Sequence, residues 1–415
     1  MAVFQRATCQ RTTFQRVNSQ CAATLCSVIG ASLIFCANTT NAEDNFHKLL
    51  ADGEAYGKLN LRYESAEQDN PLEDADALTL RTMLGYNSAN MNGFSATIEF
   101  EDVRQVFGLG DYSVGPAGYN VGEYSVIADP EVTEVNQAFI KYSNNGLTAK
   151  MGRQIIALDN HRFVGHVGWR QDWQTFDGLT AVYSPNDSIK LTYGYLDKRN
   201  RIFAEAADID SEDHILNGSF KTPIGTIKGY AYLLENEDNN SELDTVGVSL
   251  NGKVKADNVS FLYAAEYATQ ETDTDFEADY LFLEGGVSVY GITAKLGYEL
   301  LGSDDGAYGF STPLATLHKF NGWADLFLNT PGTGLVDTHV NIGSKLGPGK
   351  LNVIYHTFEA DEDSAGMSDY GTEWNLQYVM KFGKHYDVGF KYASYSADDF
   401  GVDTDRLWAW VGMSF

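Results

Sequence analysis

Apolar and polar side chains alternate along most of this chain, and this period of two constrains its fold more than any other feature. One segment places Trp374, Leu376, Tyr378, Met380 and Phe382 on one face, with mostly polar residues between them. Because successive side chains of a strand point to opposite faces of a sheet, each such segment predicts a strand with one apolar face. The 40 glycines, 24 tyrosines and 23 phenylalanines, against only 8 prolines, also favour many strands joined by tight turns.

The connections between the expected strands alternate in length. We expect eighteen strands, at residues 53–65, 76–87, 93–103, 132–143, 146–158, 173–184, 188–198, 213–221, 225–235, 243–251, 256–268, 277–289, 291–301, 335–346, 349–360, 369–383, 385–396 and 403–415. Short turns such as 144–145 and 347–348 alternate with longer loops such as 104–131, 159–172 and 302–334. Short turns at one end and long loops at the other are typical of bacterial outer-membrane barrels. The sequence therefore predicts an all-β fold, a single antiparallel transmembrane β-barrel of about eighteen strands with short periplasmic turns and long extracellular loops.

The first 42 residues have the composition of a secretory signal peptide. They carry Arg6, Arg11 and Arg16, no acidic residue, and an apolar run over 25–37. This run is shorter than the roughly 20 residues that a membrane anchor needs, so we expect cleavage after Ala42 and a barrel domain over 43–415. The cysteines all lie in this segment, which leaves the mature chain without a disulfide or a thiolate metal site: Cys9, Cys21, Cys26 and Cys36.

The C-terminus adds a second sign of an outer-membrane protein. Residues 407–415 alternate between an apolar face and a second face, and the chain ends on Phe415. A terminal strand of this kind resembles the recognition signal of outer-membrane barrels. No stretch after the signal has 18 consecutive apolar residues, so a membrane role must come from strands. We expect the partners to be outer-membrane lipid and lipopolysaccharide, a small-molecule or oligosaccharide solute, and the barrel-assembly machinery.

Charge and motif patterns exclude several function classes. The formal net charge of −28 argues against a nucleic-acid binder, which needs a basic face. The histidines are scattered and no serine–histidine–carboxylate order is legible, so we expect no enzyme activity, no cofactor and no metal ion. A barrel of 16–18 strands is too wide to be filled by its own side chains and leaves an aqueous channel. A pore for small hydrophilic solutes is therefore the expected function.

The strand faces opposite the apolar ones would line this pore, and they carry many cations. The expected pore-lining cations outside the long loops are Lys58, Arg62, Arg81, Lys141, Lys150, Lys190, Lys228, Lys295, Lys345, Lys381 and Lys391. Acidic and amide residues are interspersed with them, so two interpretations stay open: a mixed, water-solvating wall, or a ladder of cations that passes an anionic solute. Most of the acidic excess lies in the long loops.

Three loops are too long to be simple connectors. Residues 104–131 and 302–334 are expected to fold inward, and the apolar spacing of 314–327 predicts a short helix in the second. The third loop, 159–172, concentrates His161, Arg162, His166, Trp169 and Arg170. Guanidinium forks and indole planes suit a constriction that contacts carboxylates and sugar faces.

Two of these loops resemble a known family. The residues that carry the resemblance are 151–154, 160–165, 168–171 and 174–177, together with the run 312–325. They resemble the alginate-export porin family. The resemblance implies an eighteen-stranded outer-membrane barrel whose arginine-rich lumen conducts a polyuronate. It also implies a basic constriction at Arg153, Arg162 and Arg170, and a gating loop with His318, Lys319, Trp323 and Asp325. The many lumen lysines, few arginines and acidic loops of this chain depart from that pattern.

The sequence thus predicts an outer-membrane porin for passive passage of small hydrophilic solutes, with anionic oligosaccharides or polyuronates such as alginate as cargo. The alternatives are a general non-specific porin with cation preference and a non-conducting surface adhesin. Conductance and ion preference discriminate among the three.

Overall fold

The computed structural model describes residues 47–115, 119–364 and 366–415. The chain divides into two compact units, residues 1–51 and 52–415. In the first unit only residues 47–51 are described, as a turn of helix. The expected signal peptide and its cleavage point at Ala42 lie outside the described residues. None of the helices in the described ranges has the length and apolarity to cross a membrane.

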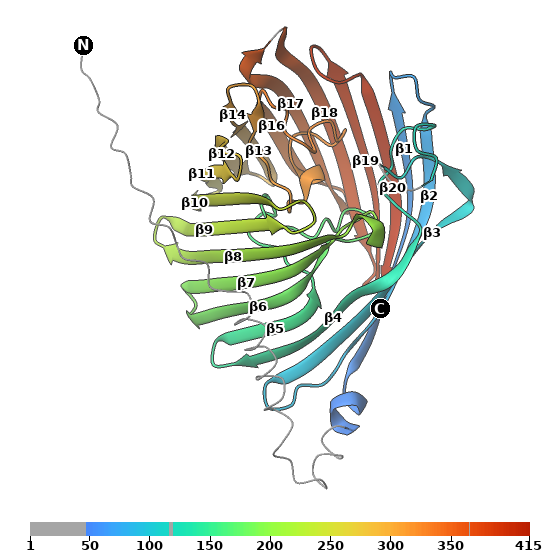
Figure 1. Ribbon diagram of the computed structural model, residues 1–415, viewed down its shortest axis with the longest axis vertical. Coiled ribbons are helices and arrows are strands. Elements are labelled where there is room, and N and C mark those ends of the chain that lie inside the picture. Colours follow the sequence, from blue (N-terminus) through green and yellow to red (C-terminus); the bar gives the residue numbers. More distant parts are fainter. Residues whose placement is uncertain (1–46, 116–118, 365) are drawn as a thin grey trace. The chain divides into compact units, whose positions relative to one another are not determined.

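Residues 52–415 form a closed barrel of eighteen antiparallel strands (Figure 1). Each wall strand pairs with its neighbours along the chain, and the barrel closes where the first strand, β1 (Glu54–Gln68), pairs with the last, β20 (Thr404–Ser414). Closure pairs both edges of the sheet, which is what a lipid-embedded sheet requires. The predicted fold is confirmed.

The observed strands correspond one to one with the predicted ones. The other wall strands are β2 (Ala75–Asn87), β3 (Phe94–Asp111), β4 (Val132–Asn144), β5 (Leu147–Gln154), β6 (Thr175–Asn186), β7 (Ile189–Asn200), β8 (Ile209–Thr222), β9 (Gly225–Asn236), β10 (Ser241–Ala256), β11 (Val259–Thr272), β12 (Glu277–Val289), β13 (Ile292–Leu301), β16 (Leu335–Leu346), β17 (Gly349–Ser364), β18 (Met367–Phe382) and β19 (Tyr386–Ala397). The largest differences are β3 and β10, which continue beyond the predicted 103 and 251. Strand β5 stops before the predicted 158 because the chain turns into the barrel there.

The two ends of the barrel differ as expected. Turns such as 145–146 and 347–348 define the short-turn end, and loops such as 155–174 and 302–334 define the long-loop end. At the β4–β5 turn, Asn145 and Gly146 have φ angles of 48° and 80°. Positive φ at both central residues is the type I′ hairpin turn that fits the twist of paired strands. Local sequence therefore determines the short turns.

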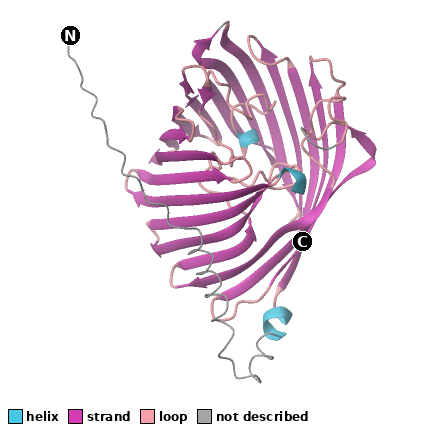
Figure 2. Ribbon diagram, in the orientation of Figure 1, coloured by secondary structure: helices cyan, strands magenta, loops and turns pink. Residues whose placement is uncertain are grey.

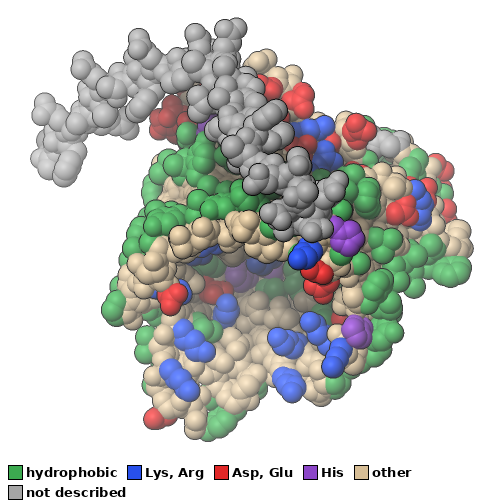
Figure 3. Space-filling view, turned by 90° about the horizontal axis from the view of Figure 1, so that it is seen from below, with side chains coloured by type: hydrophobic (Ala, Val, Ile, Leu, Met, Phe, Trp, Pro, Cys, Tyr) green, Lys and Arg blue, Asp and Glu red, His purple; other side chains and the backbone are tan. Residues whose placement is uncertain are grey.

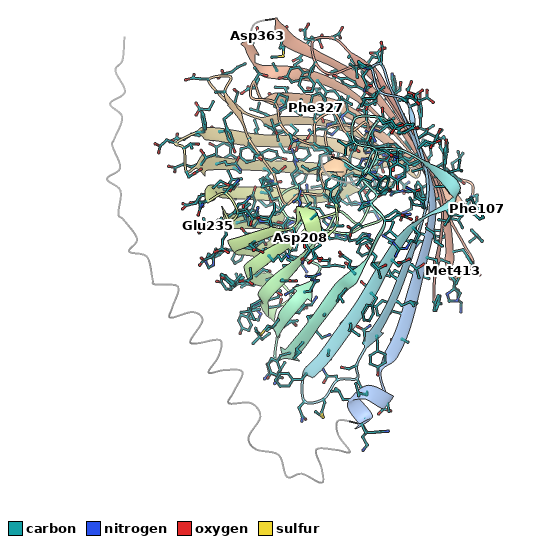
Figure 4. All side chains as sticks on the ribbon, turned by 45° about the vertical axis from the view of Figure 1, so that its right-hand side comes forward. Phe107, Asp208, Glu235, Phe327, Asp363 and Met413 are labelled. Atoms are coloured by element: carbon teal, nitrogen blue, oxygen red, sulfur yellow. The ribbon has the colours of Figure 1, made fainter. Side chains whose placement is uncertain are left out.

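The wall has an apolar outside and a polar inside. Leu84, Ile140 and Leu296 are 54%, 61% and 60% exposed. Charged side chains on the opposite strand faces are buried, among them Glu64 and Glu299. This reverses the distribution of a soluble protein and provides an apolar surface for lipid. In Figure 4, Phe107 lies on the outer side of the wall, whereas Phe327 lies inside.

Two long loops enter the barrel and build an apolar core within it. We call residues 155–174 loop A and residues 302–334 loop B; both are visible as coil inside the strands in Figure 2. Their apolar side chains pack with lumen-facing residues of the wall in one buried cluster that includes Val164, Leu314, Trp323, Phe327, Tyr280, Phe358 and Trp408. The barrel is thus occupied by its own loops.

Loop B does not form the helix predicted over 314–327. It contains a small hairpin, β14 (Ser303–Asp304) with β15 (Tyr308–Gly309), and a single 3₁₀ turn, η2 (Leu317–Lys319). Positive φ at Asn321, Gly322 and Asp325 is incompatible with a continuing α-helix. The apolar residues of 314–327 face the core from an irregular backbone, which explains why their spacing was misleading.

The third long loop, 112–131, also turns inward. Its Tyr112, Val114 and Ile127 are buried in a second cluster with small residues of β1 and β2. The Arg62 side chain of β1 donates to Asp129 of this loop. The expectation that this loop folds inward is therefore confirmed for its described residues.

Candidate functional site

Loops A and B join across the lumen through their backbones. The Gly165 N–H donates to the Leu314 carbonyl at 2.8 Å, and the Thr316 N–H donates to the His161 carbonyl at 3.0 Å. A Cβ at Gly165 would lie 2.3 Å from Thr316 Oγ1, so this approach requires a glycine. We call the joined loops the partition.

Arg162 connects the partition to the wall. Its Nε donates to Glu299 Oε1 of β13 at 2.8 Å, and its two terminal nitrogens donate to Thr312 Oγ1 at 3.1 Å and Asn321 Oδ1 at 3.2 Å. The side chain is 1% exposed. Every nitrogen of the guanidinium is occupied, and Tyr280 of β12 donates a further hydrogen bond to the same carboxylate oxygen at 2.6 Å. Arg162 therefore fixes loop A to loop B and to the wall.

Arg170 anchors the other end of loop A. It donates to both carboxylate oxygens of Glu64 on β1, at 3.0 and 2.9 Å, and to Asp325 of loop B at 2.9 Å. Glu64 also lies 3.4 Å from Arg62 and 3.5 Å from Arg406. Three guanidinium groups therefore surround one carboxylate, and all four side chains are buried. Transferring a charged side chain from water into the protein interior costs free energy. A buried ion is therefore stable only where partners of opposite charge offset this cost.

An aromatic and basic cluster lies beside Arg170. His318 of loop B stacks on Trp169 of loop A with centroids 4.8 Å apart, and Lys391 of β19 lies 3.8 Å from the Trp323 ring centroid. Burial lowers the pKa of His318 to about 3 although Asp325 opposes this shift, so the ring is neutral at pH 7. Since the Asp325 carboxylate can only accept, Nδ1 of the neutral ring donates to it at 2.7 Å, and Nε2 is left as the acceptor, 2.6 Å from Lys391 Nζ.

The partition separates two cavities. One of about 460 Å³ lies toward the long-loop end and is lined by Arg162, Thr312 and the ends of β9 to β11. The other, of about 710 Å³, extends toward the short-turn end. It is lined by Glu299, Asn321 and wall residues near that end, such as Lys253. Arg162 lines the first and its partner Glu299 lines the second. Their ion pair is therefore part of the barrier between the two cavities.

The short-turn end carries cations of a different kind. Lys190, Lys345 and Lys381 share the strand faces of buried polar residues, and each is exposed near that end of its strand. Within the described ranges these three lysines form no ion pair, and neither do Lys58, Lys141 and Lys150. Figure 3, seen from below, shows lysine and arginine side chains around a hollow with few acidic groups beside them. This mouth is basic although the chain is acidic.

Other predicted pore residues are paired or packed. Arg153 makes a two-point contact with Asp177, at 2.8 and 3.0 Å, and shares no partner with Arg162 or Arg170. Lys295 pairs with Glu284 at 2.9 Å. Further contacts are those of Arg81 with the Trp173 ring at 4.7 Å, Lys58 with the same ring at 5.2 Å, Lys150 with the Phe139 ring at 4.6 Å, and Lys319 with the Asn160 carbonyl at 2.7 Å. The structure brings Arg162 and Arg170 to the predicted gating loop, and the roles of all these residues stay predictions.

Apart from Asp325, which was predicted in the gating loop, the acidic partners of Arg162 and Arg170 were not predicted as site residues. Alternation placed Glu64, Glu299 and Glu373 on lumen faces, but their pairing depends on loops that enter from elsewhere in the chain. Glu373 of β18, for example, accepts the backbone N–H groups of Trp323 and Ala324 and so holds loop B. No local pattern in the sequence indicates these contacts.

Comparisons with known proteins agree on family and fold. A family model described as alginate export matches residues 57–302. OccAB4 of Acinetobacter baumannii shares the fold with a TM-score of 0.69 at 17% identity, over 88% of this chain and 98% of that one. OpdK, an outer membrane protein of Pseudomonas aeruginosa, gives 0.66 at 15% identity over 87% and 98%. No curated protein sequence matches the chain. Family and fold are those of bacterial outer-membrane channels rather than enzymes.

Proposed function

Because this outer-membrane channel belongs to the alginate-export family, we propose that its cargo is an anionic oligosaccharide of the polyuronate class, such as alginate. The observation that carries the proposal is the set of unpaired lysines at the short-turn mouth. An ammonium group without a carboxylate partner is free to meet the carboxylate of a passing sugar acid.

The distribution of charge favours entry from the periplasm. Short turns of outer-membrane barrels lie on the periplasmic side, so the basic mouth would face the periplasm. Exposed acidic residues in the long loops, such as Glu237, Asp238 and Asp273, would face outward. A mouth of opposite charge raises the local concentration of an anion and its rate of entry, and a rim of like charge lowers both. We therefore propose export as the favoured direction.

A single small carboxylate is a second candidate cargo. Cavities of about 460 and 710 Å³ border the partition on its two sides, a size that suits one small molecule better than a polymer. The structural neighbour OpdK was also solved with vanillate, a carboxylate. In this alternative the partition stays in place during transport, whereas a polyuronate would require it to move.

The test is a reversal-potential measurement on the purified full-length protein in a planar bilayer under a salt gradient. We expect anion preference, with block by a uronate oligomer at concentrations where the monomeric uronate has no effect. Equal block by the monomer would favour the small-carboxylate candidate. Cation preference without block would leave a general porin, and absence of conductance would leave an adhesin; either result would overturn the proposal.

The remaining expectations concern export and assembly of the protein itself. We propose cleavage after Ala42, lipopolysaccharide around the long-loop end, and recognition of the C-terminal strand by the barrel-assembly machinery. Phe415 supports the last point, because its backbone pairs with Gly57 in both directions at 3.0 Å, at the seam where the barrel closes. Mass spectrometry of the mature protein tests the cleavage. Deletion of Phe415, followed by measurement of the folded fraction in the outer membrane, tests the recognition.

A further inference from the structure

Three metal-ligating side chains converge on the lumen face of β16 and β17. Asp337 and His339 are two residues apart on β16, and therefore point to the same side of the sheet. His356 of β17 lies directly opposite His339 in the strand register, and the two imidazole rings are 5.2 Å apart. The pairing of two consecutive strands thus brings the three side chains together on one face.

The donor atoms have the spacing of a metal site. His356 Nδ1 hydrogen-bonds Asp337 Oδ1 at 2.8 Å, a contact that a bound ion would replace, and His339 Nδ1 lies 3.4 Å from the same oxygen. One ligand atom from each of the three residues can be chosen so that all lie within 4.8 Å of one another. Metal–ligand bonds of about 2.1 Å in tetrahedral geometry separate the ligand atoms by about 3.4 Å, so small side-chain adjustments would enclose an ion. This is the one such three-residue group in the part of the chain that the structure describes.

Unsatisfied nitrogens provide a second observation that points to a ligand. His339 Nδ1 and His356 Nε2 are both buried without a hydrogen-bond partner. His356 as a whole is 5% exposed. A buried imidazole nitrogen that makes no hydrogen bond carries a desolvation cost. An ion bound beside Asp337 Oδ1 would remove this cost at His339 Nδ1.

The neighbouring wall fixes the orientation of His339. A Cβ at Gly297, the residue opposite His339 on β13, would lie 2.3 Å from His339 Nε2. The ring therefore lies over a position that only glycine leaves open. This packing directs Nε2 toward β13 and turns Nδ1 back toward the Asp337 carboxylate.

The group is accessible from the lumen. Asp337, His339 and His356 all line the cavity of about 710 Å³ at the short-turn side of the partition, together with Asn341 and Lys319. An ion with three protein ligands would keep one or more coordination positions for water or for a solute in this cavity. Catalytic and exchangeable metal sites have this open arrangement, whereas purely structural ones are closed.

We propose that Asp337, His339 and His356 bind a divalent transition-metal ion such as Zn²⁺. Two imidazoles and one carboxylate suit Zn²⁺ and its neighbours in the first transition row better than Mg²⁺ or Ca²⁺, which prefer oxygen ligands. The ion places positive charge on the wall of the inner cavity and offers a coordination position to a carboxylate. The site does not depend on the identity of the cargo.

The test is a Zn²⁺ titration of the purified barrel, without a polyhistidine tag, against a chromophoric chelator. Wild-type protein should bind one Zn²⁺ per chain. H339N and H356N should each weaken binding by at least about tenfold, since even outer-shell changes at metal sites cost this much. H385N is the matched control, because His385 is exposed at the short-turn end and its ring hydrogen-bonds the Ser414 carbonyl through Nδ1 at 2.7 Å. This variant should bind like wild type.

Heat-modifiable migration on a denaturing gel verifies that each variant is folded. Should both histidine variants fail to fold, D337N and the visible spectrum of Co²⁺ bound to the wild type replace them, because that spectrum distinguishes tetrahedral coordination by the protein from a hydrated ion. The proposal would be overturned if the wild-type protein did not bind one Zn²⁺ per chain. Binding that is unchanged in both H339N and H356N would overturn it as well.

Discussion

The arginines of the partition and the lysines of the short-turn mouth carry the same charge in opposite settings. Arg162 and Arg170 are buried, and each reaches a carboxylate at 2.9 Å or less. Lys190, Lys345 and Lys381 are exposed and form no ion pair with the residues that the structure describes. A buried cation without its partner would be destabilising, so the arginines serve to hold the loops. A lumen cation that already forms an ion pair is occupied, so only the unpaired cations are free to contact a solute.

The largest effect should come from breaking the arginine cluster at its shared carboxylate. Glu64→Ala leaves Arg170, Arg62 and Arg406 without this carboxylate in a buried setting, and should lower the free energy of unfolding by about 3–5 kcal/mol. Denaturant unfolding in detergent or lipid measures it. Lys345→Ala is the control and should change stability by less than about 0.5 kcal/mol. Equal losses of unfolding free energy in the two variants would contradict the distinction between the buried arginine cluster and the exposed lysines.

Removing the mouth lysines should affect solute entry and leave stability unchanged. The triple variant K190Q/K345Q/K381Q should lower the on-rate of block by a uronate oligomer about tenfold at low salt, because steering depends on unpaired charge. The matched triple change to arginine keeps the charge and should keep the on-rate. An on-rate that stays at the wild-type value in the glutamine variant would show that these lysines do not meet the solute.

Opening the partition should raise conductance. The double variant R162Q/E299Q removes the ion pair between the two cavities without leaving an unpaired buried charge. Single-channel conductance should rise about twofold, since a constriction sets the resistance of a pore. The control is K198Q, whose side chain pairs with Asp208 at 3.3 Å near the long-loop end of β7. A conductance equal to wild type in R162Q/E299Q would contradict the position of the barrier.

The smallest effect should come from the acidic rim. Glu237→Gln with Asp238→Asn removes two charges from the turn between β9 and β10. At physiological ionic strength charges are screened over about 8 Å, so the ratio of anion to cation permeability should change by less than about 1.5-fold. The reversal potential at this salt concentration measures it. A larger shift would assign ion selectivity to the rim and not to the mouth.

Local sequence patterns predicted the strands of the barrel wall. The arrangement of the loops inside the barrel depends on contacts between residues that are distant in the sequence. Alternation and turn residues such as Asn145 and Gly146 act within a few positions, so strands and short turns were predictable. The contact of Arg162 with Glu299 joins residues 137 positions apart, and no period in the sequence encodes it. The predicted helix over 314–327 was wrong for the same reason, because its apolar side chains fit a core formed by other strands.

In the proposed mechanism, unpaired lysines draw an anionic oligosaccharide into the barrel from the short-turn end. The most direct test measures the on-rate of block by a uronate oligomer added to one side or the other of channels inserted in a single orientation. We expect a faster on-rate from the short-turn side, and a loss of this difference when salt screens the charge. Equal on-rates from both sides at low salt, or faster block from the long-loop side, would contradict it.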